Sequence, residues 1–376
     1  TLANATKTRD MRTIGLTASI MAAALALTPA QAGDKGGLTV APVATDADAA
    51  NGGVIYALPR TVVRIELTAR VVVASVGPFF QYSTRFLNRT DVVTENATSW
   101  KLTGAKVSTT GQADPARRFK VTAAQGAELP SMTLAADGTL LGINTSPSSD
   151  ATPEATPATP NTAYATFAEV PLSQSVLSRT SKAAMAEECA QTIYSLRDSR
   201  TKIICGAREA VLPDAGSMKT ALAEIDRLER LHTELFVGRR DTLIVTKVVE
   251  VTPDYDGTNN MVPVRFSESS GFVDAMDLSG KPVYVDLEFD DRGRVNAYAP
   301  DSKMRKEAPM TGLFYILPGS VIVKVSDRNI VLCQKKVSCT QNGQLANLPA
   351  EQLTNHQITL DAATGALSSL RLIDKK

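Results

Sequence analysis

The chain has few of the residues on which common catalytic and metal sites depend. Its 376 residues include two histidines and four cysteines, and no two cysteines form a Cys-x-x-Cys pair. Transition-metal sites usually gather these residue types at close spacing. The Gly-x-Ser-x-Gly turn of many serine hydrolases is missing as well. From the sequence we therefore assign no catalytic, cofactor-binding or metal-binding residues, and we expect no cofactor.

Aromatic residues and net charge are also low. Phe, Tyr and Trp make up 5% of the residues, with a single Trp, so a carbohydrate-binding face of stacked rings would have few residues to draw on. The formal net charge is +1, whereas nucleic acids and anionic membranes require a concentrated basic surface. We therefore expect no nucleic-acid partner.

Long apolar runs are confined to the N-terminal region. Met11-Arg12 precedes an apolar segment from Ile14 to Leu27, and Ala30-Gln31-Ala32 supplies the small residues that a signal peptidase reads. Residues 1–32 are therefore interpreted as a signal peptide with an upstream extension. No later segment is apolar for long enough to cross a bilayer, so we expect an exported protein in the periplasm or on the extracellular surface.

An oxidising compartment permits disulfides between the four cysteines. Cys189 and Cys205 fall in one helical pattern, where a rise of ~1.5 Å per residue separates them by about 24 Å, beyond bridging distance. Cys189 shares a stripe with apolar residues and is interpreted as a small buried residue. Cys333 and Cys339 could bridge only if residues 334–338 form a tight turn, which the two central lysines disfavour.

Two stretches far apart in the chain have nearly the same sequence. Gly53-Val54-Ile55-Tyr56-Ala57-Leu58-Pro59 corresponds to Gly312-Leu313-Phe314-Tyr315-Ile316-Leu317-Pro318, and a β-branched run follows each. The two regions also end alike, at residues 133–140 and 359–367, where Asp and Gly indicate a turn. We interpret this pattern as an internal repeat of β structure.

The repeat contains one inconsistency. After the shared Pro, the apolar positions of the second copy are offset by one residue, with Val63, Ile65 and Leu67 against Val321, Val323 and Val325. A shift of one residue moves every side chain of a strand to the other face of its sheet. Either the copies differ by a bulge or the similarity is partly coincidental, and the sequence leaves both interpretations open.

A helical segment separates the two β regions. Ser181 to Ile204 has apolar residues at helical spacing, and Gly206 follows as a stop signal. A second helical pattern begins with a cap at Asp214 or Ser217 and ends at Gly238. The short connection predicts an antiparallel helical hairpin, and one hypothesis is that the protein self-associates through it.

Together these patterns predict an α+β fold, mainly antiparallel β, with two β units and an intervening helical hairpin. A stretch with repeated Thr-Pro is interpreted as a linker because it cannot bury a core. The expected organisation is a signal peptide with upstream extension at 1–32, a flexible leader at 33–52, an N-terminal β domain at 53–143, a Thr/Pro-rich linker at 144–165, the helical hairpin at 166–240 and a C-terminal β domain at 241–376.

The titratable residues that stand out have ordinary structural interpretations. His232 lies on the apolar stripe of the second helix, which is typical of a core or interface residue, and His356 precedes a strand and is predicted on a surface loop. Asp286, Glu288 and Asp290 alternate with apolar residues. This alternation favours the polar face of a half-buried strand over the facing carboxylates of a glycosidase.

Two further polar stretches contain residue types that occur in binding sites. Residues 254–260, Asp-Tyr-Asp-Gly-Thr-Asn-Asn, place oxygen atoms at alternate positions, as calcium loops do. Position 265 is Arg where an EF-hand loop would carry its liganding Glu, so ordinary turns are the favoured interpretation. Arg239-Arg240 is interpreted as a solvated helix end rather than as a binding patch.

Four groups of residues resemble a known family. They are the stretches Tyr56–Thr61, Gly77–Phe79, Ala190–Arg200 and Phe266–Tyr284. Through these motifs the chain resembles the secreted Bacteroidota proteins grouped as domain of unknown function 4831. The resemblance implies an envelope or secreted setting, and it supplies no catalytic residues that could be carried over.

The sequence therefore favours a secreted or envelope-associated protein that is a non-enzymatic binding or scaffold module, with an envelope protein or glycan as its partner. The reasons are the scarcity of catalytic residue types and the repeated β units, which commonly present loops or strand edges to partners. The alternative is an envelope hydrolase for glycan or peptide, whose acidic residues would come together only in the fold.

Overall fold

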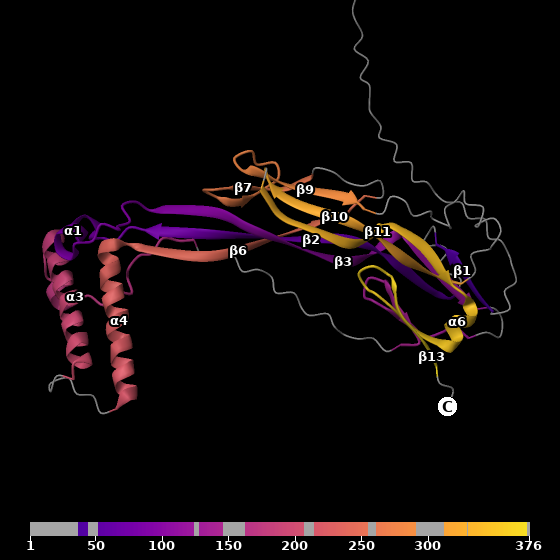
Figure 1. Cartoon of the computed structure of the whole chain (residues 1–376), viewed down its shortest axis with the longest axis horizontal. Coiled ribbons are helices and arrows are strands. Elements are labelled where there is room, and N and C mark those ends of the chain that lie inside the picture. The colour runs from indigo at the N-terminus through magenta and orange to yellow at the C-terminus, as the bar shows by residue number, and fades with distance from the viewer. Residues whose placement is uncertain are drawn as a thin grey trace, which may run out of the picture.

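The computed structural model describes residues 37–43, 52–123, 128–145, 162–206, 214–254, 261–290, 312–328 and 330–373. The molecule is elongated, with long strands that run from a helical part at one end to a small sheet at the other (Figure 1). Its elements are β1 (Leu38–Pro42), β2 (Val54–Ser75), η2 (Phe80–Tyr82), α1 (Ser83–Leu87), β3 (Ala97–Ala123), β4 (Met132–Leu134), β5 (Leu140–Ile143), α2 (Gln174–Leu177), α3 (Lys182–Ile204), α4 (Ala215–Val237), β6 (Arg239–Val251), β7 (Met261–Ser267), β8 (Gly271–Val273), β9 (Lys281–Phe289), β10 (Leu313–Asp327), β11 (Ile330–Leu348), α6 (Ala350–Asn355), β12 (His356–Leu360) and β13 (Leu367–Leu372).

The strands form three sheets, and neighbouring strands pair antiparallel in each. The long sheet has the order β1-β3-β2-β6, the cover sheet β11-β10-β9-β7-β8 and the end sheet β13-β12-β5-β4. The predicted α+β class with mainly antiparallel strands is therefore confirmed. Alternation of β-branched and polar residues along β2 and β10 accounts for strands that bury one face.

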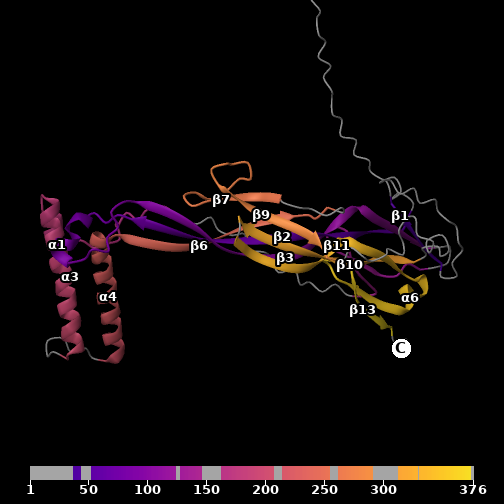
Figure 2. The same ribbon diagram turned by 45° about the horizontal axis from the view of Figure 1, so that its top comes forward.

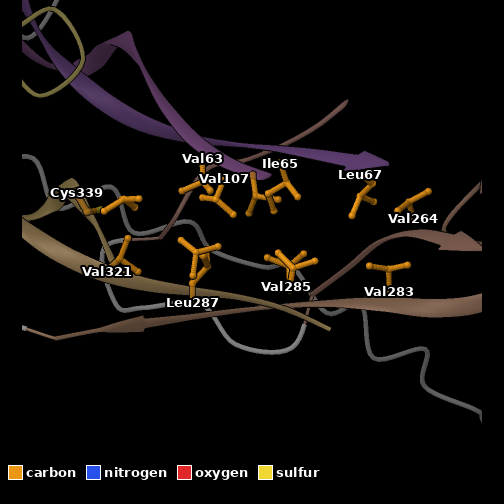
Figure 3. Close-up of a cluster of buried hydrophobic side chains, with 14 of the residues drawn as sticks. Val63, Ile65, Leu67, Val107, Val264, Val283, Val285, Leu287, Val321 and Cys339 are labelled. Carbon is orange, nitrogen blue, oxygen red and sulfur yellow. The ribbon is translucent and has the colours of Figure 1, made fainter. Parts of the chain in front are cut away.

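The long sheet and the cover sheet pack face to face around a central core. Figure 3 shows Val63, Ile65, Leu67 and Val107 of the long sheet pointing toward Val264, Val283, Val285, Leu287, Val321 and Cys339 of the cover sheet. All of these side chains are buried. This arrangement is a two-layer sandwich in which the inward residues of each strand interdigitate.

A second cluster of buried residues, the end core, lies where the starts of β2 and β10 meet the end sheet. Tyr56 is fully buried there, and its hydroxyl accepts the Phe314 amide at 2.9 Å and lies 3.3 Å from the Phe314 carbonyl oxygen. A buried hydroxyl without such partners would be costly. Tyr56 therefore joins the two halves of the repeat at their first residues.

The helical hairpin projects from the opposite end of the long sheet (Figures 1 and 2). Ser181 Oγ accepts the amide of Ala184 at the start of α3, and Asp214 Oδ1 accepts the amide of Ser217 at the start of α4. Gly238, with φ of +80°, ends α4. These boundaries confirm the helices expected from capping residues and apolar spacing.

The base of the hairpin has its own cluster, the helical core. It joins buried residues of α3 and α4 to the segment after β2 and to residues around α2: Phe79, Leu87, Phe167, Val170, Val176, Ala186, Cys189, Ala190, Ile193, Leu231, Leu235 and Phe236. Toward the tips, α3 and α4 carry half-buried and exposed residues, so the outer part of the hairpin projects from the body.

The internal repeat is visible in the architecture. Each copy contributes a long hairpin, β2–β3 or β10–β11, followed by a short one, β4–β5 or β12–β13. The two short hairpins join through the pairing of β5 with β12, where Ile143 lies opposite Ile358. The end sheet is therefore built equally from the two copies.

The register of the long hairpins explains the offset of one residue between the copies. Each hairpin has one large break, between Ala57 and Pro59 in β2 and between Leu317 and Gly319 in β10, and each break leaves four residues of the partner strand out of register, 114–117 in β3 and 340–343 in β11. The breaks are equal in size, but they fall at different positions of the shared Tyr-x-Leu-Pro motif. The break in β2 skips Leu58, whereas the break in β10 skips Pro318, which is one position later in the motif. The apolar parity after the break is shifted accordingly.

Two expectations on domain organisation require correction. β6, expected in a C-terminal β domain at 241–376, pairs with β2, and β12 pairs with β5. The β regions at 53–143 and 241–376 therefore complete each other's sheets and share cores instead of forming two domains. The expected flexible leader at 33–52 contains β1, because Leu38–Pro42 pair with the end of β3 and Leu38 is buried.

Two sequence predictions lie outside the described residues. They are the signal peptide at 1–32 and most of the linker at 144–165. Both stay predictions.

Candidate functional site

The acidic residues of β9 lie where strand alternation predicts. The apolar residues of this strand are buried or half-buried toward the central core, whereas Asp286 is half-buried and Glu288 exposed on the other face. Asp286 is the register neighbour of Lys324 in β10, and Asp290 forms an ion pair with Lys336 of β11. Acids two residues apart on one strand share a flat face with lysines, which differs from the facing carboxylates of a glycosidase cleft.

Both histidines have backbone partners. His232 is buried in α4, as predicted, with Nδ1 2.9 Å from the Leu228 carbonyl oxygen. His356 is half-buried, and its Nδ1 lies 3.2 Å from the Gln352 carbonyl oxygen. The predicted surface loop around His356 is wrong, because α6 runs directly into β12 at this residue.

The four cysteines are free. Cys333 and Cys339 both lie in β11, so residues 334–338 are extended and the tight turn needed for a bridge is not formed. Cys189 is buried in the helical core, as predicted, and burial raises the pKa of its thiol to about 11. Cys205 is exposed immediately after α3.

Arg239 is more than a solvated helix end. Its Nη1 donates to Glu169 Oε1 at 2.7 Å and its Nε donates to Asp241 Oδ1 at 2.9 Å. These bonds tie the start of β6 to the segment before α2, and hydrogen bonding to Asp241 raises the pKa of Arg239. Arg240 is exposed, as predicted.

The stretch 254–260, for which the sequence favours ordinary turns over a calcium loop, is described only at Asp254, and residues 255–260 lie outside the described part. Across the residues that are described, no group of three or more His, Cys, Asp or Glu side chains is arranged to hold a metal ion. No helix among them is long and apolar enough to span a membrane.

A buried polar cluster, which sequence reasoning missed, joins the two long hairpins. Thr61 of β2 donates its amide to Thr340 Oγ1 at 2.8 Å, and Thr340 of β11 donates its amide to Thr61 Oγ1 at 3.0 Å. Gln341 donates to the Thr61 carbonyl oxygen at 2.7 Å, and its Oε1 accepts from Cys339. Arg117 reaches the Thr340 carbonyl oxygen at 3.3 Å.

This cluster, here called the hairpin junction, has a structural role rather than a catalytic one. Thr61 and Thr340 are completely or almost completely buried. Their hydroxyls bond to backbone amides, to each other and to Gln341. An activated hydroxyl nucleophile needs a base within hydrogen-bond reach, and the bonds of these two hydroxyls involve no carboxylate or imidazole. The hairpin junction fixes how residues 340–343 of β11, which are out of register with β10, pack on β2.

A second feature that the sequence analysis missed is the loop Asp274–Gly280, here called the docking loop. Met276 is 86% exposed and Leu278 is 80% exposed, the highest values among the exposed large apolar side chains of the described chain. The chain between β7 and β9, which contains this loop, rises above the sheets (Figures 1 and 2). Exposed apolar side chains that form a contiguous patch mark interaction sites, whereas scattered ones are ordinary.

The backbone of the docking loop is held by hydrogen bonds at both ends. Arg265 of β7 donates from Nε to the Ala275 carbonyl oxygen at 2.8 Å and from Nη1 to the Gly280 carbonyl oxygen at 3.1 Å. Asp274 and Asp277 each accept an amide two residues further on, at 2.9 Å. The loop therefore presents its apolar side chains from a backbone that is held by hydrogen bonds rather than from a flexible one.

Space around the loop is equally restricted. A Cβ added at Gly280 would lie 2.6 Å from Val273 Cγ2 and 3.1 Å from the Phe266 amide nitrogen. At Gly271, where φ is +77°, an added Cβ would lie 2.8 Å from the Trp100 ring. Trp100 also donates its amide to the Glu268 carbonyl oxygen at 2.8 Å, so the turn between β7 and β8, which precedes the docking loop, rests on β3 of the long sheet.

The sequence held a usable signal for this loop. Asp-Ala-Met-Asp-Leu-Ser-Gly contains two Asx-turn patterns in series, each with an Asp whose carboxylate meets an amide two residues on. Turn residues usually accompany polar side chains, so Met276 and Leu278 between the aspartates are out of place there. What the sequence could not show is that both point into solvent.

Comparison with known proteins gives one result. The family profile described as "Domain of unknown function (DUF4831)" matches residues 52–368. Neither the curated proteins nor the solved structures yield a match. Because the match covers most of the chain, the resemblance carried by the four motifs is confirmed, and the chain belongs to the family of domain of unknown function 4831.

Proposed function

We propose that the protein is an exported, envelope-associated scaffold or binding module that acts without catalysis. The observation that carries the proposal is the continuity of β2 and β3, with 22 and 27 residues, from the helical part to the end core. At ~3.3 Å per residue, β2 alone spans roughly 70 Å. Such a strand pair, backed by a second sheet, is suited to hold two ends of a molecule at a fixed separation.

The surfaces of this elongated molecule, here called the rod, support a binding role. The helical hairpin projects at one end and the docking loop rises from the middle of the body. Loops and projecting elements on a rigid scaffold are the usual places for recognition.

Export is supported by the signal-like sequence at residues 11–32 alone. Mass spectrometry of the protein from its native host tests it directly. We expect an N-terminal peptide that begins at Gly33, recovered with the envelope or medium. A cytoplasmic protein that keeps residues 11–32 would overturn this part of the proposal.

The binding role is tested by photo-crosslinking in native cells, with the crosslinker placed at several exposed positions along the rod. We expect at least one position to yield a specific protein or glycan adduct. Absence of adducts at every position would count against a binding module. So would turnover of an envelope polymer by the purified protein that is lost in a Glu288→Gln variant.

Self-association through the helical hairpin stays a prediction. Leu228, a residue on the apolar stripe of α4, is half-buried, so Leu228→Asp can weaken the hairpin itself as well as a dimer. Light scattering on the unmodified protein at high concentration is therefore the cleaner test. A monomer at all concentrations would end the hypothesis.

A further inference from the structure

We infer that the docking loop is the contact site for a protein partner whose apolar pocket is rimmed by lysine or arginine side chains. The inference rests on the proposed binding function and specifies its site and the chemistry of its partner. Met276 and Leu278 would fill the pocket, and Asp274 and Asp277 would face its basic rim.

Exposure sets this loop apart from other apolar side chains on the surface. Ile244 is 64%, Ile330 67% and Leu372 73% exposed, and each of them lies in a strand. Ile330 and Leu372 have exposed apolar neighbours on their strands, but these are only partly exposed, Val331 at 48% and Leu370 at 40%. Met276 and Leu278 are one residue apart in a loop, and both exceed all of these values. Contiguous exposed apolar side chains mark interaction sites, whereas scattered ones need no explanation.

Fixed geometry makes the loop suitable for binding. The Arg265 bonds, the two aspartate caps and the crowding at Gly280 together determine the path of the backbone. A loop that is already in its bound conformation loses little entropy on association, so more of the contact energy appears as affinity. Large apolar anchors on a preorganised backbone are typical of interface hot spots.

Charge selects the kind of partner. Asp274 and Asp277 are both exposed beside the apolar side chains, and hydrogen bonding by Ser279 lowers the pKa of Asp277. The Asp277 carboxylate is therefore charged at neutral pH. Insertion of such a loop into a bilayer would bury charge at high cost, and an anionic lipid surface would repel it. A protein pocket with a basic rim satisfies both the apolar side chains and the carboxylates.

The test places a photo-crosslinking amino acid at position 276 of the full chain in its native host, with position 372 as the matched control. We expect a protein adduct at 276 that is missing at 372. The crosslinked peptide of the partner should combine apolar residues with Lys or Arg. Adding Leu278→Ser should reduce the yield of this adduct about tenfold or more, with no change in the melting temperature of the purified variant.

The charge step is tested by the double variant Asp274→Asn, Asp277→Asn. Asn keeps an oxygen that can accept the same amides, so the loop retains its caps while it loses both charges. We expect a severalfold lower adduct yield, and we expect the dependence of that yield on salt concentration to disappear. An unchanged yield would overturn the basic-rim assignment.

Other outcomes separate the inference from the proposed function. Protein adducts elsewhere on the rod but none at 276 would overturn the docking loop and leave the binding role standing. Two results would overturn the stated partner. One is an adduct with a second copy of the chain. The other is binding of the purified protein to phosphatidylcholine or phosphatidylglycerol vesicles, measured by cosedimentation, that depends on Met276. No adduct at any position would overturn both.

Discussion

Thr61 and Thr340, 279 residues apart in the chain, each donate a backbone amide to the other's hydroxyl, at 2.8 and 3.0 Å. This reciprocal pair lies at the point where the first long hairpin meets the out-of-register segment of the second. Both side chains are buried, and each hydroxyl accepts the buried amide of the other residue; the Thr61 amide also lies 3.3 Å from Gln341 Oε1. The two copies of the repeat are thereby linked at one defined register.

The first prediction concerns this pair. Thr61→Val keeps the shape of the side chain but removes the acceptor of the Thr340 amide, which stays buried. A buried donor without a partner costs about 1–3 kcal/mol, and we expect the free energy of unfolding to fall by that amount in urea titrations. The matched control is Thr110→Val, an exposed position of β3, which should change stability little. If both variants lowered the free energy of unfolding equally, the loss would not come from the hydrogen bonds between Thr61 and Thr340.

The second prediction compares two glycines of the same strand. A Cβ added at Gly111 would lie 2.1 Å from the Ala362 carbonyl oxygen, whereas one added at Gly104 would meet nothing within 4 Å. Gly111→Ala should therefore destabilise the protein by about 1–3 kcal/mol through overpacking between β3 and the turn after β12.

Gly104→Ala serves as the control for that comparison. It should be neutral or stabilise the protein by up to about 1 kcal/mol, because Ala loses less backbone entropy than Gly in a strand. Thermal unfolding followed by circular dichroism measures both variants. If Gly111→Ala unfolded at the same temperature as the unmodified protein, the turn after β12 would not pack on β3 as closely as the position of Ala362 indicates.

The third prediction concerns pH. Hydrogen bonding by the Ser217 amide lowers the pKa of Asp214 from its ordinary value of 3.8. A carboxylate with a lowered pKa in the folded state contributes stability above its unfolded pKa, and this contribution is lost as the pH falls through the folded pKa. Asp214→Ala should therefore expose the first turn of α4 to hydrogen exchange at neutral pH, and its difference from the unmodified protein should vanish in strong acid.

Asp214→Asn separates charge from capping in the same experiment. Asn is also a good N-cap residue, so the first turn of α4 should stay protected at neutral pH. Protection in this variant should no longer change between neutral and acidic solution, since no carboxylate titrates. Rapid exchange in the Asn variant at neutral pH would show that the charge, and not the accepted hydrogen bond, holds the helix start.

The fourth prediction orders the four thiols by reactivity. Cys205 is exposed, Cys333 is half-buried, and Cys189 and Cys339 are buried with raised pKa values caused by desolvation. Because the thiolate is the reactive form, maleimide at mildly alkaline pH should label Cys205 first and Cys333 more slowly. Cys189 and Cys339 should react only after unfolding. Peptide mass spectrometry over time gives the order, and early labelling of Cys339 would contradict its burial in the central core.

Much of the local structure could be predicted because it depends on residues that are neighbours in the chain. Ser181 and Asp214 cap the two helices where the sequence places capping residues. Gly138, with φ of +87°, forms the turn that Asp-Gly indicates between β4 and β5. The repeat was also readable, because its copies keep the same turns and the same β-branched runs.

The candidate site was less accessible to sequence reasoning. Asp286 and Glu288 could be placed on a solvent face from alternation alone, and His232 in a core from helical spacing. Met276 and Leu278 could not be recognised as exposed, because apolar residues in a short loop are as often buried under it. Their exposure depends on how Arg265 and Gly280 hold the loop above the sheet.

By itself, then, the sequence determined the elements: strand alternation, helix ends, turns and the duplication of a β unit, all of which arise from local backbone preference and spacing. Tertiary structure alone decided that the two β regions share their sheets, that the break in β10 falls one residue later than in β2, and that Gly111 is crowded while Gly104 is free. The physical reason is distance along the chain. Pairing, burial and crowding are set by residues hundreds of positions away, as between Thr61 and Thr340, and no local pattern encodes which of them will meet.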